Sequence, residues 1–173
     1  MNLPTWITLS RLLAVPAILI GLTLDTPVGR WLSLAVFLLG AGTDWLDGYL
    51  ARRLDLVTDL GKLLDPLVDK LLVLAPLLCL VQLQQIPAWG VFAIVARELG
   101  ISTWRSQARR VTGANLWGKL KTVLQIVAIA VLIAFPGWWV GQVCFWGAVV
   151  LTLWSGWLYV RPLPQPESVV EDG

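Results

Sequence analysis

The sequence contains no histidine. This absence excludes histidine general bases, phosphohistidine intermediates and most zinc sites. It also excludes phosphatidyl transferases of the phospholipase D type, because these need histidine nucleophiles. Only two cysteines are present, Cys79 and Cys144, and both lie inside apolar runs. We interpret them as small buried hydrophobic residues that need no disulfide.

Charge is also scarce in this chain. Charged residues make up 14% of the 173 residues, whereas hydrophobic residues make up 57%. That balance is typical of a membrane protein rather than a soluble one. The net charge of +2 is too small to suggest nucleic-acid binding. No linker divides the chain, so we expect one domain over residues 1–160, followed by a disordered cytoplasmic tail over residues 161–173.

The apolar residues gather in six segments, each close to the length of about twenty residues that a membrane span needs. We therefore predict an all-α protein, an integral membrane bundle of six transmembrane helices. The spans are expected at residues 4–22, 30–52, 61–82, 88–108, 116–135 and 138–160.

Basic residues mark one side of this predicted bundle. Nearly all lysines and arginines lie on the side that holds residues 52–62 and 105–121, whereas Arg30 alone marks the other side. Basic loops stay in the cytoplasm. We therefore expect a multi-pass protein of the cell inner (plasma) membrane with both termini cytoplasmic. Tryptophans near the span ends, such as Trp31 and Trp89, are expected to form an aromatic belt.

One stretch, DWLDGYLARRLDLVTDLGKLLDPLVD, runs from Asp44 to Asp69 and carries six aspartates. Asp44 and Asp47 are three residues apart, and Asp65 and Asp69 are four apart. Residues at these spacings share one face of a helix, so each pair directs two carboxylates the same way. A polar connection of about ten residues favours antiparallel neighbours. The two pairs are therefore expected to face each other near the cytoplasmic side.

Four crowded carboxylates repel one another, and burial increases the repulsion. Divalent cations relieve it, because magnesium, manganese and calcium prefer hard oxygen ligands. Two metals close together form a clamp for displacement at phosphorus, and Arg52 could neutralise phosphate oxygens. The residues alone therefore predict a dimetal site for a diphosphate substrate. An ordinary solvated loop remains the alternative for Asp55 and Asp59.

The same stretch fits the pattern D-x-x-D-G-x-x-A-R-x8-G-x-x-x-D-x-x-x-D without a mismatch. This pattern resembles the signature of the CDP-alcohol phosphotransferase family. The segments NLPTWITLSR, LLDPLVDKLL, VARELGIS and WGKLKTVLQ resemble bacterial members of that family, and the similarity covers most of residues 2–130. The fixed letters of the pattern are Asp44, Asp47, Gly48, Ala51, Arg52, Gly61, Asp65 and Asp69.

The resemblance implies two substrates, cofactors and residue roles. The donor would be CDP-diacylglycerol and the acceptor sn-glycerol 3-phosphate, giving phosphatidylglycerophosphate and CMP in a homodimeric enzyme. Two divalent cations, Mg2+ or Mn2+, would be held by Asp44, Asp47, Asp65 and Asp69, and Asp69 would also be the catalytic general base. The CDP part would be bound by Thr43, Asp47, Gly48, Ala51, Arg52 and Gly61.

An acceptor phosphate needs fixed cations, and several spans offer them. Arg97 and Glu98 lie near the middle of the fourth predicted span, where charges are costly and usually face an interior. A structural ion pair is the alternative for these two residues, and snorkelling toward lipid headgroups is the alternative for the remaining cations. Lys70 directly follows Asp69 and is expected to face elsewhere on its helix. The candidate acceptor-phosphate residues are Arg11, Arg97, Arg105, Lys119 and Lys121.

Two other interpretations remain open. Within the family, the acceptor could instead be phosphatidylglycerol, inositol phosphate or serine. An ion transporter, a different class of protein, would also place acids in the membrane. A cation path has no use for Arg52 beside the acids, however, whereas a diphosphate site does.

Overall fold

The computed structural model describes residues 3–54, 59–107 and 116–160, and within these ranges it contains six helices and no strand. Side chains are described over residues 10–43, 67–103 and 120–157. The predicted disordered tail over residues 161–173 lies outside the described residues. The helices are α1 (Leu3–Thr23), α2 (Pro27–Leu54), α3 (Asp59–Gln82), α4 (Ala88–Gln107), α5 (Leu116–Ala134) and α6 (Trp139–Val160).

The all-α prediction is confirmed, and one helix start needs correction. The sequence predicted the second helix from residue 30, but α2 begins at Pro27. Thr26 caps this helix, because its Oγ1 accepts a hydrogen bond from the Gly29 amide at 3.1 Å. Proline suits the first helical position, where its missing N–H removes no intrahelical bond. The connection between α1 and α2 is therefore shorter than predicted.

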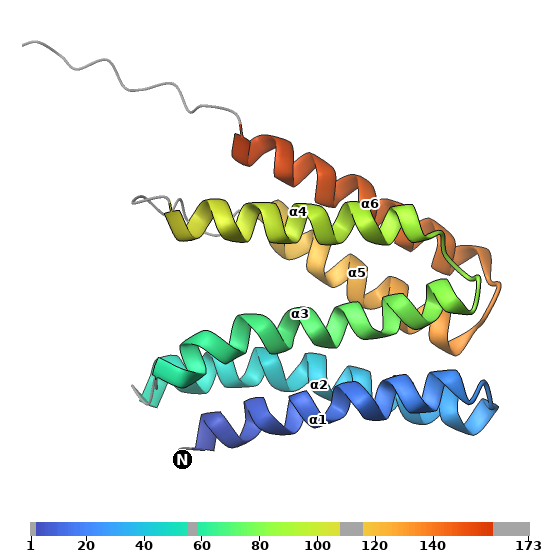
Figure 1. Cartoon of the computed structure of the whole chain (residues 1–173), viewed down its shortest axis with the longest axis horizontal. Helices are drawn as coiled ribbons and strands as arrows, with labels where there is room; N and C mark the ends of the chain where they lie inside the picture. The colour runs from blue at the N-terminus through green and yellow to red at the C-terminus, as the bar shows by residue number, and fades with distance from the viewer. Residues whose placement is uncertain (1–2, 55–58, 108–115, 161–173) are drawn as a thin grey trace, which may run out of the picture.

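The six helices run roughly lengthwise through the molecule, with α5 and α6 inclined to the others (Figure 1). α1 packs against α2 and α3, α4 packs against α6 and α3, and α5 packs against α6 and α2. The connections α1–α2, α3–α4 and α5–α6 lie together at one end, which we call the turn end. At the opposite end α2 ends and α3 begins, and we call it the aspartate end.

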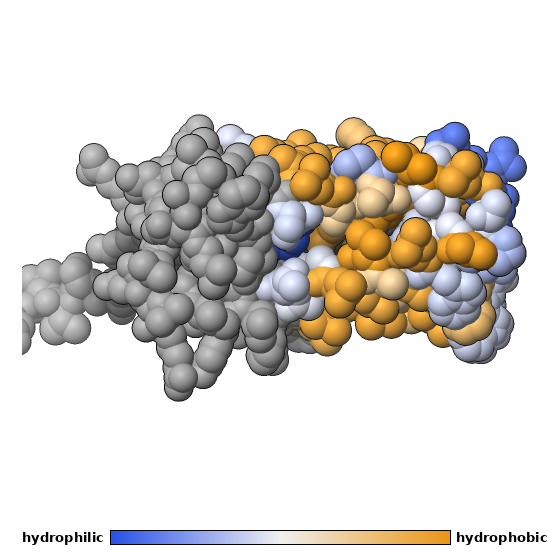
Figure 2. Space-filling model, turned by 90° about the horizontal axis from the view of Figure 1, so that it is seen from below, coloured by the Kyte–Doolittle hydropathy of each residue, from blue (hydrophilic) through white to orange (hydrophobic). Residues whose placement is uncertain are grey.

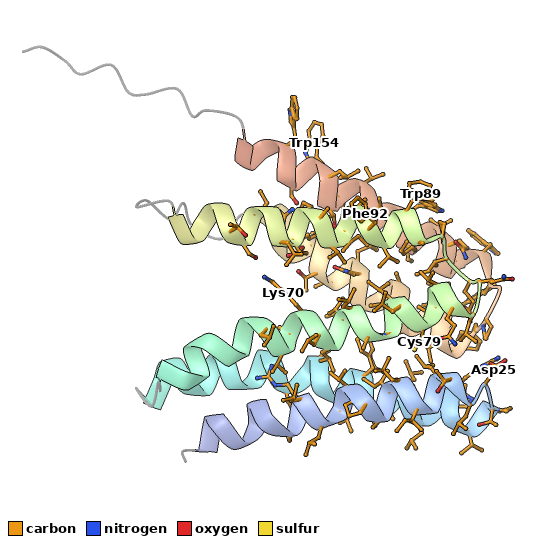
Figure 3. The ribbon with its side chains drawn as sticks, in the orientation of Figure 1. Asp25, Lys70, Cys79, Trp89, Phe92 and Trp154 are labelled. Atoms are coloured by element: carbon orange, nitrogen blue, oxygen red, sulfur yellow. The ribbon has the colours of Figure 1, made fainter. Side chains whose placement is uncertain are left out.

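The bundle has an apolar core and an apolar outer surface. Phe37, Leu80, Ile129 and Phe145 are fully buried between the helices. Large apolar side chains such as those of Trp89, Phe92 and Trp154 are instead exposed on the outside, and Figure 3 shows Trp154 projecting away from α6. Figure 2 shows the resulting hydrophobic surface over the described helices, with hydrophilic residues gathered at the turn end. An outward apolar surface of this kind suits a hydrocarbon environment.

One helical segment in the described part of the chain, Trp139–Trp157, is long and apolar enough to cross a membrane. Two shorter apolar segments, Ser10–Thr23 and Leu120–Ala134, accompany it. Exposed tryptophans lie at the turn end, where Trp31 and Trp138 both contact Phe135 with edge-on ring geometry. This clustering at helix ends agrees with the predicted aromatic belt.

Candidate active site

The backbone brings the predicted aspartates to one end of the bundle. Asp44 and Asp47 lie in α2, and Asp65 and Asp69 lie in α3. These two helices pack against each other, and the end of α2 and the start of α3 lie at the same end (Figure 1). Of these four aspartates, Asp69 is the one whose side chain is described, so side-chain contacts can be given for Asp69 alone.

Asp69 is held by a cation from another helix. Arg11 of α1 donates a hydrogen bond from Nη1 to Oδ1 of Asp69 at 2.8 Å. The Arg11 side chain is only 4% exposed, whereas that of Asp69 is 40% exposed. Arg11 is therefore buried in the bundle rather than extended toward headgroups. Charge-assisted bonds of this type are strong and directional, so Arg11 fixes the position of a carboxylate that is partly exposed.

A second charged group joins α4, α5 and α6. Glu98 on α4 forms ion pairs with two cations. One is Lys121 on α5, and the other is Arg97, the preceding residue on α4, whose Nη1 lies 3.4 Å from Oε1 of Glu98. Arg97 also donates from Nη2 to Oγ of the fully buried Ser155 at 2.9 Å. The structural ion pair that the sequence left open as an alternative is therefore present, and it includes Lys121 as a third member.

Lys70 is a residue that sequence reasoning set aside. Its Nζ donates a hydrogen bond to Oγ of Ser102 on α4 at 2.6 Å. Figure 3 shows the side chain of Lys70 extending from α3 toward α4. Glu98 and Ser102 are four residues apart, so the sequence places them on one stripe of the α4 helix. The stripe does not reveal that a lysine of α3 lies opposite it, because helical periodicity carries no information about the neighbouring helix.

Comparison with known proteins covers nearly the whole chain. The family model for CDP-alcohol phosphatidyltransferase matches residues 1–154. Proteins named CDP-diacylglycerol–glycerol-3-phosphate 3-phosphatidyltransferase are similar to it: one from Bacillus subtilis (strain 168) is 38% identical over 91% of this chain and 93% of its own length. The one from Rickettsia bellii (strain RML369-C) is 33% identical over 92% of this chain and 94% of its own length. The one from Salmonella choleraesuis (strain SC-B67) is 37% identical over 89% of this chain and 90% of its own length.

The chain belongs to the CDP-alcohol phosphatidyltransferase family. The resemblance inferred from the eight-residue pattern is thereby confirmed. Proteins of this family generally use divalent metals. Among the described residues, no group of three or more histidines, cysteines, aspartates or glutamates comes together, and the side chains of three of the four predicted ligands are not among those described. The donor set itself fits hard divalent cations, because it consists of carboxylates alone.

The residues predicted to bind CDP are described only in part. Thr43 donates from Oγ1 to the backbone carbonyls of Leu39 and Gly40, at 2.9 and 3.0 Å, so its hydroxyl hydrogen is used within α2. Its oxygen lone pairs can still accept a bond from a ligand. The positions of Gly48, Ala51 and Arg52 lie in α2 and that of Gly61 in α3, at the aspartate end. Their surroundings, and those of the side chains of Arg105 and Lys119, lie outside the described residues.

Proposed function

We propose that this CDP-alcohol phosphatidyltransferase transfers a phosphatidyl group from CDP-diacylglycerol to sn-glycerol 3-phosphate, releasing CMP. The observation that carries this proposal is the similarity to enzymes that bear this name, which extends over about nine-tenths of the chain and of each relative. The interior contacts agree with it. A partly exposed carboxylate and a group of cations lie inside a bundle whose outer surface is apolar.

Asp69 is the proposed general base. The acceptor hydroxyl oxygen forms a new bond to the phosphorus that carries diacylglycerol, and the bond between this phosphorus and the oxygen of CMP breaks. CMP leaves with the electron pair, and the hydroxyl proton passes to a carboxylate oxygen of Asp69. Arg11 occupies Oδ1 of Asp69 and holds the carboxylate in one orientation. A fixed base is effective because the reacting groups need not be aligned anew in each turnover.

The four aspartates are the proposed ligands of two divalent cations, Mg2+ or Mn2+. When bound, these cations supply charge neutralisation at the diphosphate and at the leaving CMP. Arg52 would add a positive charge for the phosphate oxygens. Small residues at positions 48, 51 and 61 would allow the cytidine part to approach the backbone. Family membership and the eight-residue pattern support these assignments.

Cations of the bundle are proposed to receive the phosphate of the acceptor. Lys121 and Arg97 lie on neighbouring helices and share the carboxylate of Glu98. A dianionic phosphate can compete for such cations, since each charge-assisted bond contributes about 1.5 to 3 kcal/mol. Arg11, Arg105 and Lys119 complete the proposed set, Arg11 through its place beside Asp69.

An acceptor panel tests this function directly. Purified protein would be given labelled CDP-diacylglycerol with glycerol 3-phosphate, phosphatidylglycerol, inositol phosphate or serine in separate reactions. We expect product from glycerol 3-phosphate alone. Use of another acceptor in its place would keep the chain in the family but overturn the proposed substrate.

The proposed location is the cell inner membrane, with all six helices spanning it, the aspartate end cytoplasmic and two chains forming a homodimer. The apolar outer surface supports the membrane setting, and Arg30 is the only basic residue of the turn end. Basic residues are enriched in the cytoplasmic loops of membrane proteins. The diacyl tails of the donor would then stay in lipid while its diphosphate reaches the aspartates.

Cysteine labelling tests this orientation. In a background with Cys79→Ala and Cys144→Ala, one cysteine would be introduced at Thr58, between α2 and α3, or at the exposed Ala88, which begins α4. We expect an impermeant maleimide to label Ala88→Cys in intact cells, and Thr58→Cys only after the membrane is opened. Reversed labelling would invert the topology, and labelling of both positions would show that α3 does not span.

A further inference from the structure

Lys70 stands out because its ammonium group donates a hydrogen bond to a hydroxyl rather than forming an ion pair with a carboxylate. Within the described residues, its ammonium is hydrogen-bonded to Ser102 and is paired with no acid. The described acid on the facing helix, Glu98, already meets both Arg97 and Lys121. A half-buried ammonium in a bundle with an apolar exterior is costly unless an anion neutralises it. The arrangement therefore leaves a positive charge available to an anionic ligand.

The same charge lies near the proposed acceptor-phosphate residues. Ser102 follows Glu98 by one helical turn on α4. Lys70 contacts Ser102 and Lys121 contacts Glu98, so the two lysines contact neighbouring turns of α4. The positive charges of Arg97 and Lys70 both lie within electrostatic range of Lys121. Among the described side chains, Lys70, Arg97 and Lys121 place three basic groups on α3, α4 and α5, and Glu98 is the acid that Arg97 and Lys121 share.

Lys70 also directly follows Asp69, the proposed base, in α3. Successive residues of an α-helix point about 100° apart. Asp69 accordingly meets Arg11 of α1, whereas Lys70 meets Ser102 of α4. A small acceptor that carries a hydroxyl at one end and a phosphomonoester at the other has partners for both groups on two adjacent residues of α3.

We propose that Lys70, held by Ser102, is a specificity-determining residue that binds the phosphomonoester of the acceptor. This inference rests on the proposed function and deepens it, since it identifies the residue that distinguishes a dianionic phosphomonoester from an uncharged alcohol or a phosphodiester. The bound phosphate takes the place of a missing carboxylate partner. Ser102 fixes the ammonium before the acceptor arrives, which lowers the entropy lost when the complex forms.

Steady-state kinetics of purified Lys70→Met test the proposal. Loss of a charge-assisted bond to phosphate is expected to raise the Michaelis constant for glycerol 3-phosphate at least about tenfold. The constant for CDP-diacylglycerol and the rate at saturation should stay within about twofold. Lys70→Arg should restore most of the acceptor affinity, because it restores the charge. Arg30→Gln is the matched control, since it removes a cation at the turn end.

Two further measurements keep the outcome decisive. Ser102→Ala should give a smaller increase, about threefold, because the ammonium remains but is no longer fixed; this variant also serves if Lys70→Met does not fold. Inorganic phosphate should compete with glycerol 3-phosphate in the wild type and compete less well in Lys70→Met.

Several results would overturn the proposal. An unchanged acceptor constant in a folded Lys70→Met that remains active would remove Lys70 from the phosphate site while leaving the reaction intact. An increase confined to CDP-diacylglycerol would assign Lys70 to the donor. A fall in the saturated rate alone would make its role structural. A wild-type protein that ignores glycerol 3-phosphate would instead overturn the proposed function itself.

Discussion

Two arginine–aspartate pairs in this molecule have the same chemistry and different settings. Arg30 and Asp25 lie at the turn end, five residues apart in the chain, with side chains 29% and 52% exposed. Arg11 and Asp69 lie 58 residues apart on α1 and α3, and the arginine is 4% exposed. A local exposed pair contributes little and serves the turn. A buried charge is costly to place inside a bundle, so we expect the interior pair to have a role beyond stability.

The same contrast extends to the two regions around these pairs. At the turn end, polar groups finish helices and hold the connections between them: Thr26 caps α2, and Gln142 of α6 donates from its side chain to the backbone carbonyl of Gln85 in the α3–α4 connection. Nearer the aspartate end, polar groups join different helices, as Lys70 joins Ser102 and Lys121 joins Glu98. The turn end is therefore expected to determine stability, and the aspartate end to determine catalysis. Three experiments test this division.

The largest effect is expected from removing the metals. A chelator should abolish activity, and magnesium or manganese should restore it, because four carboxylates cannot bind a diphosphate without cations between them. Asp44→Asn, Asp47→Asn and Asp65→Asn should each lose most activity while the helical circular dichroism stays unchanged. Full activity of these variants in the presence of chelator would contradict the dimetal site.

The second experiment compares the two aspartates of the two pairs. Asp69→Asn should lower the saturated rate by roughly 10²- to 10⁴-fold, the range usual for loss of a general base. Asp25→Asn should leave the rate within about twofold, since it loses only an exposed pair at a turn. Rates would be measured at saturating donor and acceptor with both proteins folded. Equal losses at the two positions would break the proposed division.

The helices were largely predictable from sequence, and their mutual arrangement was not. Apolar runs punctuated by proline, glycine and polar residues placed every helix end within three residues, the largest difference being the start of α2 at Pro27. Such signals are local. The partner of Asp69 lies 58 residues away and that of Lys70 lies 32 residues away. Periodicity predicts which face of a helix a residue lies on, but it does not predict which residue of a neighbouring helix contacts that face.

The candidate site was predictable to a similar extent. The eight-residue pattern identified the family, which the comparisons confirm. The metal ligands and the CDP-binding residues remain predictions, because most of their side chains lie outside the described residues. Arg11, predicted to bind the acceptor phosphate, contacts Asp69, and this position also suits a residue near the reacting hydroxyl. Lys70 was missed, since its partner Ser102 belongs to another helix.

The smallest effect on catalysis is expected from the turn end, where packing rather than charge is at stake. A Cβ added to Gly21 would lie 2.2 Å from Ser33 Oγ and 2.9 Å from the backbone carbonyl oxygen of Gly29. The carbonyl cannot move without shifting α2, so overpacking should cost about 1 to 3 kcal/mol. This exceeds the gain of up to about 1 kcal/mol from replacing glycine by alanine in a helix.

Gly100→Ala is the matched control for this last experiment. A Cβ added to Gly100 in α4 meets nothing within 4 Å, so only the gain in helix propensity remains. In detergent, Gly21→Ala should unfold at a lower temperature than the wild type, whereas Gly100→Ala should unfold at the same or a higher temperature. Below these transitions, both variants should keep the wild-type Michaelis constants. A changed constant for glycerol 3-phosphate in Gly21→Ala, without a loss of thermal stability, would show that the α1–α2 contact controls the site. That result would contradict the proposal that the turn end determines stability and the aspartate end determines catalysis.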